Sequence, residues 1–242
     1  MYFIYKNSEN PLVSVIIFIG IEFFTLSFTA LRQMIAISII LNSYGFIKKN
    51  KPIKFILLVL LASLFHKTAL TFLIVYVLKY IPINKKTIIS GFLILLIIQL
   101  IGFYAIVSII NAIYPYYIPN NFAFTTDGMF QAAVMLFYLI IGLYLYFKKT
   151  DDEDKKQLDL LYIIIFLAFS IQSFTNRIPM IGRLMWYFYI FIIILLPNQI
   201  SKVKNKNIQK IAYVLVITLF LLQYITSSMN MYNVLPYEFL IR

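Results

Sequence analysis

Long apolar runs alternate along the chain with short polar segments. Runs such as Phe55–Leu64, Ile88–Ile110 and Tyr162–Ile171 have no polar periodicity, so none of their faces is expected to meet water. A backbone in hydrocarbon must satisfy its own hydrogen bonds, and the longest of these runs exceed the length of a barrel strand. The pattern therefore predicts an all-α protein, a polytopic integral membrane helical bundle that forms a single transmembrane domain over residues 1–242.

The lysines fall between the apolar runs. Fifteen of the 17 lie in four short segments, Lys48–Lys54, Lys79–Lys86, Lys148–Lys156 and Lys202–Lys210. Lysine in short loops is typical of the cytoplasmic side of a membrane protein. With all four loops inside, the chain is expected to be a multi-pass protein of the bacterial inner membrane. It should have about 7–9 membrane segments, broken or re-entrant helices included.

Alternation from these loops orients the remaining segments. Segments expected to run outward are Ile88–Ile110, Leu158–Gln172 and Ile211–Thr226, and those expected to return are Phe130–Phe147 and Leu184–Leu196. The expected external parts are Asn111–Met129, Ser173–Arg183 and the tail Ser227–Arg242. No internal repeat is evident, so an inverted-repeat transporter architecture gains no support.

Two apolar stretches must be broken to fit this scheme. Leu12–Ile47 would measure roughly 54 Å as one helix, too long for a hydrocarbon core of roughly 30 Å, so a break is expected near Ala30–Gln33. Lys54–Lys79 lies between two loops that are both expected on the cytoplasmic side. The segment must therefore enter the membrane and return to the same side within its own length. Two half-spans would meet at Phe65–Thr68, a hairpin tolerated only where protein or a water-filled cavity surrounds it. The alternative is one continuous helix, with one lysine loop on the other side.

Composition and charge exclude several function classes. Hydrophobic residues make up 62% of the chain and charged residues 12%, while the net charge is +12. The positive charge is spread over short loops without one long basic tract, so nucleic acid is not an expected partner and membrane lipids are. The chain has no cysteine and one histidine. We therefore expect no thiol chemistry, no bound metal and no cofactor.

The scheme also brings five ionisable residues toward the outer leaflet: Arg32, His66, Lys67, Arg177 and Arg183. Ionisable groups at membrane depth are costly enough to indicate a functional site. Arginine is suited to a diphosphate because it donates paired hydrogen bonds to neighbouring oxygens. A histidine that titrates near neutrality can act as a general base. The alternatives are headgroup anchors, pairing with the scarce acids and, for the lysine, snorkelling to the interface.

Other polar and aromatic residues carry weaker signals. Asp127 is a candidate accessory residue that could act as a base or a metal ligand, although a solvated loop charge explains it better, and Glu22 could pair with Arg32 or another buried cation. An interfacial aromatic belt is the simplest explanation for six residues, and stacking on sugar rings is the alternative: Tyr114, Tyr116, Tyr117, Trp186, Tyr187 and Tyr189.

Two segments of the first third resemble a known family. The segment Leu31–Ala36 reads LRQMIA; a basic loop and Lys54–Phe55 follow, and Leu61–Leu70 reads LASLFHKTAL. In this order and spacing they resemble the EpsG family, the Wzy-like polymerases of bacterial exopolysaccharide and capsule. The resemblance is specific over about residues 25–80 and weaker beyond. Members usually carry further membrane segments before this point, so the chain is expected to lack the N-terminal helices of longer relatives.

The resemblance implies a fold related to the C-type membrane glycosyltransferases. It also implies that polyprenyl-diphosphate-linked oligosaccharides are joined into exopolysaccharide, capsule or O-antigen on the extracytoplasmic face. In that reading Arg32, Arg177, Arg183 and Lys67 bind the diphosphate, and Arg32 also offsets the charge that develops as it departs. His66 orients or deprotonates the acceptor hydroxyl. Gln33 and Asn176 are candidate accessory residues, and chain-length regulators and export proteins are the expected partners.

Two other function classes fit the same pattern. A membrane O-acyltransferase that modifies surface glycans would also use an intramembrane histidine, but would require an acyl donor. A non-enzymatic transporter of lipid-linked glycans would keep its function when His66 is replaced. A structural scaffold within an assembly complex is a further possibility.

Overall fold

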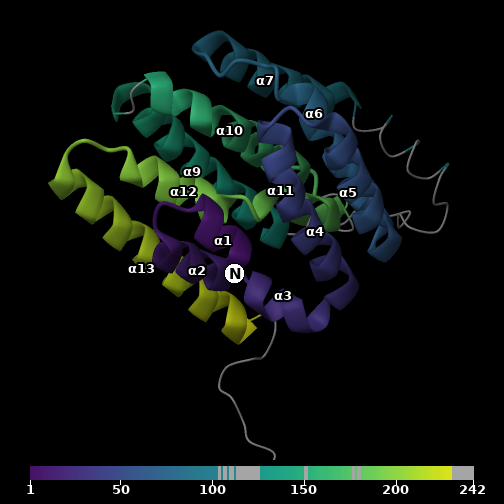
Figure 1. Ribbon diagram of the computed structural model, residues 1–242, viewed down its shortest axis with the longest axis horizontal. Helices are drawn as coiled ribbons and strands as arrows, with labels where there is room; N and C mark the ends of the chain where they lie inside the picture. Colours follow the sequence, from purple (N-terminus) through teal and green to yellow (C-terminus); the bar gives the residue numbers. More distant parts are fainter. Residues whose placement is uncertain are drawn as a thin grey trace, which may run out of the picture.

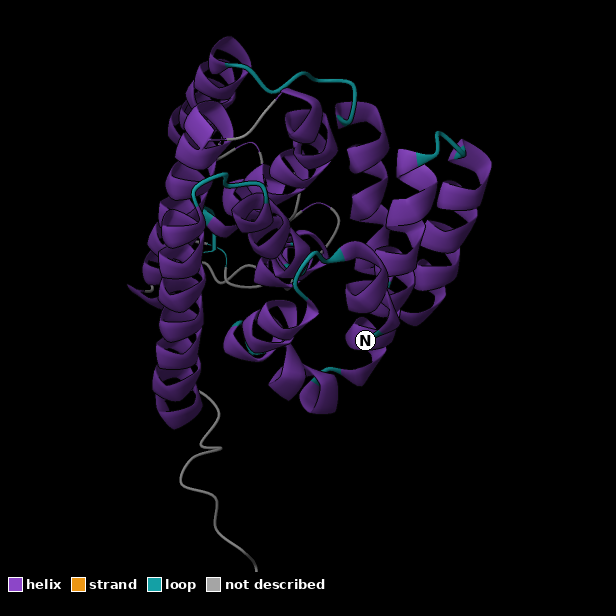
Figure 2. Cartoon of the chain, turned by 60° about the vertical axis from the view of Figure 1, so that its left-hand side comes forward, coloured by secondary structure: helices purple, strands orange, loops and turns teal. Residues whose placement is uncertain are grey.

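The computed structural model describes residues 1–102, 126–149, 152–175 and 181–230, with isolated positions at 105, 108, 112 and 178. Helices account for nearly all of this part of the chain, and it contains no strand (Figure 2). The predicted all-α class is therefore confirmed. The helices pack around one apolar core, with α13 along one flank and α7 at another (Figure 1).

The helices described here have the following bounds. In chain order they are α1 (Tyr2–Asn7), α2 (Pro11–Gly20), α3 (Phe23–Thr29), α4 (Leu31–Lys48), α5 (Pro52–Phe65), the 3₁₀ helix η1 (Lys67–Leu73), α6 (Ile74–Leu78), α7 (Lys85–Ile97), the π-helical turn η2 (Ile98–Gly102), α9 (Thr126–Lys149), α10 (Asp152–Gln172), α11 (Gly182–Tyr189), α12 (Ile192–Ser201) and α13 (Lys206–Asn230).

Two breaks interrupt the first long apolar stretch. At the first, α2 and α3 meet at an angle of 58°, and Glu22 between them has a left-handed backbone with φ of 66°. At the second, α4 starts directly after Ala30. The second break lies where the length argument expected one. The first was not predicted, because nothing in an apolar sequence around Glu22 signals a left-handed residue.

The segment after α4 forms the predicted broken hairpin. α5 ends at Phe65, His66 has an extended backbone with φ of −152°, and η1 starts at the next residue. The far ends meet again, because Lys79 Nζ donates a hydrogen bond of 2.7 Å to Asn50 Oδ1. Between tip and base, the ring of Phe55 packs against that of Phe72, with centroids 6.2 Å apart. A single continuous helix is therefore excluded.

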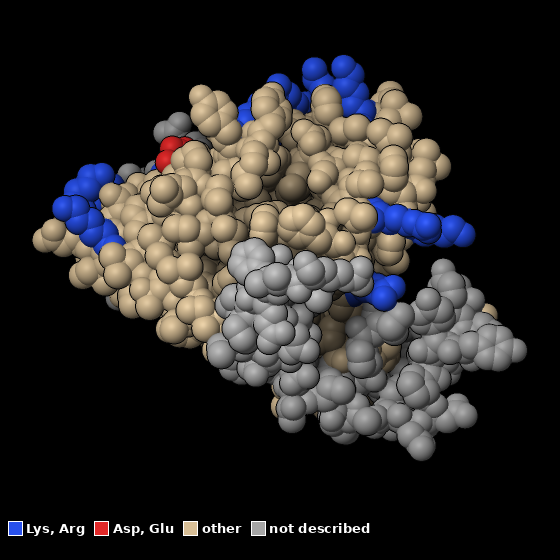
Figure 3. Space-filling view, turned by 90° about the horizontal axis from the view of Figure 1, so that it is seen from below, with Lys and Arg blue, Asp and Glu red and all other residues tan. Residues whose placement is uncertain are grey.

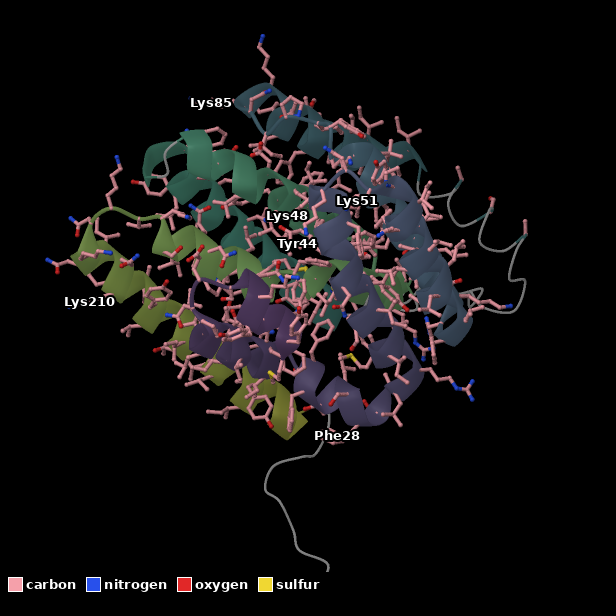
Figure 4. All side chains as sticks on the ribbon, in the orientation of Figure 1. Phe28, Tyr44, Lys48, Lys51, Lys85 and Lys210 are labelled. Atoms are coloured by element: carbon pink, nitrogen blue, oxygen red, sulfur yellow. The ribbon has the colours of Figure 1, made fainter. Side chains whose placement is uncertain are left out.

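The lysine segments gather at one end of the bundle. A polar pocket of about 320 Å³ is lined by Lys6, Lys48, Lys202 and Leu158, which come from four separate parts of the chain. Figure 4 shows Lys48 and Lys51 at one end of α4, with Phe28 beyond its other end. The charge pattern predicted this clustering. We call this end of the bundle the lysine end.

The surface is strongly apolar, as expected for a protein in a membrane. In the view of Figure 3 most side chains are uncharged, and the basic residues lie toward the edges of the described part. Leu64 is 81% exposed and Ile101 is 75% exposed, a costly arrangement in water but not in lipid. Among the described helices, Gly182–Ser201 and Lys206–Thr226 are long and apolar enough to cross a membrane. The bent pair α2–α3 makes a third span if it is taken as one.

A glycine sets the close approach of α13 to α2. A Cβ atom placed on Gly20 would lie 2.6 Å from Cβ of Phe220 and 2.7 Å from its backbone oxygen. A larger residue here would push the two helices apart. Small residues serve this purpose in membrane bundles, where packing takes the place of a hydrophobic driving force.

Candidate functional site

The starts of α4 and α11 meet at the end of the bundle opposite the lysine end. Gln33, in the first turn of α4, is only 3% exposed, and its Nε2 donates a hydrogen bond of 2.6 Å to the backbone oxygen of Arg183. This bond joins two helix N-termini that are 150 residues apart in the sequence. Arg32 and Arg183 each occupy the second position of their helix, and both are exposed.

The charged side chains in the first turns of α4 and α11 are both arginines, Arg32 and Arg183. Neither α4 nor α11 has an acidic residue in its first turn. A helix N-terminus carries partial positive charge and usually attracts acids, so an arginine there concentrates positive potential. Two such N-termini held together form an environment suited to an anion with several oxygens.

The hairpin tip brings His66 to the same place. Its Nδ1 lies 2.5 Å from Oγ1 of Thr68 and 3.0 Å from Oη of Tyr187, and Thr68 Oγ1 lies 3.4 Å from Oη of Tyr187. The three polar atoms form a closed triangle at one edge of the imidazole. Both hydroxyls therefore lie within hydrogen-bond distance of Nδ1, and in this cluster neither of them bonds the other ring nitrogen, Nε2.

Local geometry explains why these side chains converge. The extended backbone of His66 ends α5, while its backbone oxygen accepts from the amide of Ala69 and so begins η1. Tyr187 follows Arg183 by four residues in α11, so both side chains lie on the same face of that helix. Tyr187 is fully buried and holds the imidazole from the inner side.

The environment favours the neutral form of this histidine. His66 lies at the break between α5 and η1, outside both apolar helices. Burial, and secondly the positive charge of Arg183, lower the pKa of His66 below its usual value. A neutral imidazole is the form that can accept a proton.

The structure assigns positions to only some of the predicted site residues. Lys67 is exposed and directly follows His66 in the chain. Gln33 is buried and joins two helices, so it positions the site from within. Arg177, Asn176 and the side chain of Asp127 lie outside the described residues.

Two contributors to the site were missed from the sequence. Thr68 and Tyr187 hold His66, yet Tyr187 was assigned to an interfacial aromatic belt. That assignment is wrong for Tyr187 and Tyr189, which are 0% and 2% exposed and pack inside the protein. The spacing of four residues from Arg183 was the available signal. It becomes informative only once the start of α11 is known, and Gly182 and Arg183 were expected in a turn.

The side chains at the candidate site do not suggest a metal centre. Across the ranges that the structure describes, no three residues of the histidine, cysteine or carboxylate types come together as a metal site. The cluster is built from cations, one imidazole and hydroxyls, which bind anions and transfer protons.

Comparison with known proteins gives one match. A model of the EpsG family matches residues 1–239, nearly the whole chain. No curated protein and no solved structure matches the chain in the corresponding searches. The family model extends far beyond the two segments that first resembled it, and together with the apolar helices it indicates a membrane protein linked to polysaccharide synthesis. The chain belongs to the EpsG family.

Proposed function

We propose that this protein polymerises polyprenyl-diphosphate-linked oligosaccharide repeat units at the outer face of the bacterial inner membrane. The observation that carries the proposal is the hydrogen bond from Gln33 to Arg183, together with the contact of Tyr187 with His66. These contacts bring Arg183, the start of α4 with Arg32, and the imidazole into one cluster. Family membership supports the same chemistry.

In this proposal Arg32 and Arg183 hold the diphosphate of the donor, on which the growing glycan is carried. Lys67 adds a further positive charge, and Arg177 is a fourth candidate ligand. Guanidinium groups can donate paired hydrogen bonds to the phosphate oxygens and offset the charge that accumulates as the bond to the sugar breaks. Such a site needs no metal ion to stabilise its leaving group.

His66 acts on the second substrate, a single lipid-linked repeat unit with a free hydroxyl. The neutral imidazole donates Nδ1–H to Thr68 Oγ1, which in turn donates to Tyr187 Oη. Nε2 then carries a lone pair and accepts the hydroxyl proton. The hydroxyl oxygen forms a bond to the anomeric carbon of the donor glycan. The bond from that carbon to the diphosphate oxygen breaks, and its electron pair leaves with the polyprenyl diphosphate.

The separation of the two cationic ends supports the proposed orientation in the membrane. The lysine end is expected to face the cytoplasm, so the cluster at the opposite end faces outward. Repeat units would reach it after transfer across the membrane. Chain-length regulators and export proteins would act on its product.

The test is a reconstituted reaction with purified protein and lipid-linked repeat units as the only substrate. We expect glycan ladders, with one polyprenyl diphosphate released for each new glycosidic bond. Arg32→Ala, Arg183→Ala and His66→Ala should strongly slow the formation of the ladder, while Lys210→Ala at the lysine end leaves it intact. A requirement for an acyl donor would support the O-acyltransferase alternative. Movement of repeat units between leaflets without any new bond would support a transporter.

A further inference from the structure

The polar pocket at the lysine end lies at the opposite end of the bundle from Arg183 and His66. Its volume is about 320 Å³, and α1, the link between α1 and α2, α4, α10 and α12 all contribute to its lining. Leu158, Leu161 and the ring of Tyr44 form the apolar part, and the other lining residues are polar or charged. The pocket is several times larger than one water molecule needs, since the share of a water in the liquid is about 30 Å³. It therefore has room for a polar group of several atoms.

The lining of this pocket is positively charged. Lys6 from the last turn of α1, Lys48 from the last turn of α4 and Lys202 directly after α12 all line it. Three lysines and one glutamate, Glu9, give the lining residues a net charge of +2. Lysines that only orient helices in a membrane need no common cavity. Here lysines from three separate helices border the same small volume, where an anion would relieve their mutual repulsion.

The ammonium groups of two of these lysines lie near aromatic rings. Lys6 Nζ is 5.7 Å from the ring centroid of Tyr2, and Lys48 Nζ is 5.7 Å from that of Tyr44. Figure 4 shows Lys48 and Tyr44 together on α4. A ring face attracts an ammonium group but does not neutralise its charge, so both lysines can still bind an anion.

Asn198 fixes one wall of the pocket. Its Oδ1 accepts a hydrogen bond of 2.8 Å from the amide of Glu9, and its Nδ2 donates one of 2.8 Å to the backbone oxygen of Asn7. These bonds join α12 to the link between α1 and α2, across 189 and 191 residues of sequence. In the same link, Ser8 Oγ accepts a hydrogen bond of 3.1 Å from the amide of Asn10. The backbone around the pocket is therefore held in place before a ligand binds, which lowers the cost of binding.

We propose that this pocket binds a phosphate group at the cytoplasmic side of the membrane. Phosphate oxygens are strong acceptors, and lysine binds them as a point charge on a flexible stem. Basic pockets between helices on this side suit the phosphates of anionic lipid head groups, and a soluble phosphate from the cytoplasm offers the same chemistry. A bound phosphate would connect α1, α4 and α12 and so stabilise the folded protein. The proposal does not depend on polymerase activity, because the pocket shares no lining residue with the cluster of Arg183 and His66.

Thermal unfolding of the purified full chain in an uncharged detergent tests this proposal. One titration adds phosphatidylglycerol in mixed micelles, with phosphatidylcholine as the lipid control, and a second adds inorganic phosphate at constant ionic strength. A ligand that binds only the folded state should raise the Tm by about 5 °C or more at about 100 times its Kd. A shift with phosphatidylglycerol alone identifies a lipid head group as the ligand, and a shift with inorganic phosphate identifies a soluble one. No shift with either, or an equal shift with phosphatidylcholine, would overturn the proposal.

Single substitutions distinguish this pocket from the other basic surfaces of the protein. Lys48→Gln should raise the Kd of the ligand about fivefold, as expected when one lysine near a membrane surface is lost. Glu9→Gln should lower the Kd, because it removes the negative charge from the lining. The matched control is Lys49→Gln, which changes the neighbouring exposed lysine that does not line the pocket. An equal rise in Kd for Lys48→Gln and Lys49→Gln would show general attraction to a basic surface, and the proposal would be wrong.

A further variant separates this proposal from the proposed function. Arg183→Gln should leave the Kd and the Tm shift unchanged, because Arg183 belongs to the opposite end of the bundle. If Arg183→Gln removes the shift and Lys48→Gln does not, the phosphate is bound at the candidate active site. The pocket proposal then fails while the polymerase proposal stands. Binding that depends on Lys48 in a protein that forms no glycosidic bond would give the reverse result.

Discussion

The two ends of the bundle are both basic, but they are built differently. At the lysine end the cations are on loops and helix ends, and several of them lie over aromatic rings. Lys79, for example, lies over the ring of Tyr76 at 3.7 Å and binds Asn50. At the opposite end, Arg183 sits at a helix start whose backbone is bound by the buried Gln33. The charge of Arg183 there acts on a histidine that is itself held by two hydroxyls.

This difference separates two uses of positive charge. Lysine on a flexible stem in a loop biases orientation in the membrane, and any one of several neighbours can do this. Arginine at a helix start fixed by a tertiary hydrogen bond has a defined position, which binding and catalysis require. Removing a cation should therefore have little effect on activity at the lysine end and a large effect at the opposite end.

The largest effect is expected from Arg183→Ala. If the guanidinium offsets charge on the departing diphosphate, its loss should lower kcat by about 100-fold, as for other groups that stabilise developing charge. Arg183→Lys should recover only part of this, because lysine cannot donate the same paired hydrogen bonds. The measurement is the initial rate of polyprenyl diphosphate release at equal amounts of folded protein. Lys85→Ala serves as the control, and an equal loss there would remove the distinction between the two ends.

The next effect concerns pH. A general base must be neutral, so the rate should rise with pH as His66 loses its proton, with a midpoint below that of an ordinary histidine. Because the charge of Arg183 contributes to the lowered pKa, Arg183→Gln should raise the pKa and move the midpoint to higher pH. The residual rate of this variant should then fall more steeply than that of wild type as the pH is lowered, since a larger fraction of its His66 is protonated at a given acid pH. An unchanged midpoint in Arg183→Gln would contradict the electrostatic link.

A smaller effect should follow from Gln33→Leu. This change keeps a side chain of similar size in a buried position but removes the donor to the backbone oxygen of Arg183. A single hydrogen bond contributes about 1 kcal/mol, so a loss of about fivefold in kcat/KM is expected if the bond aligns α4 with α11. The pH midpoint should not move, which distinguishes a positioning residue from His66 itself. A wild-type rate would show that the two helix starts are held together by other packing.

The smallest effect should come from Lys79→Ala. This lysine makes a hydrogen bond and two contacts with aromatic rings, all at the base of the hairpin. Surface interactions of this kind contribute about 0.5 kcal/mol or less after solvent screening. Thermal stability in detergent and polymer length should both stay close to wild type. A loss of polymer comparable to that of the Gln33 variant would show that the lysine end also contributes to polymerisation.

Much of the fold could be predicted because membrane insertion depends on local properties of the chain. Apolar runs and lysine loops predicted helices, the gathering of the lysine segments and the hairpin that breaks at His66. Those features depend on segment length and charge, which a short window contains. The bend at Glu22 could not be predicted, since a left-handed residue there depends on how α2 and α3 pack.

For the site, residue identities by themselves indicated which groups are costly in a membrane: Arg32, His66 and Arg183. Only the tertiary structure decided how they are held together. Gln33 reaches a residue 150 positions away, and Tyr187 reaches one 121 positions away. The sequence shows which charged and polar groups would be costly to bury in a membrane. It does not show which side chains bind those groups, because the binding partners come from distant positions that only helix packing brings within hydrogen-bond distance.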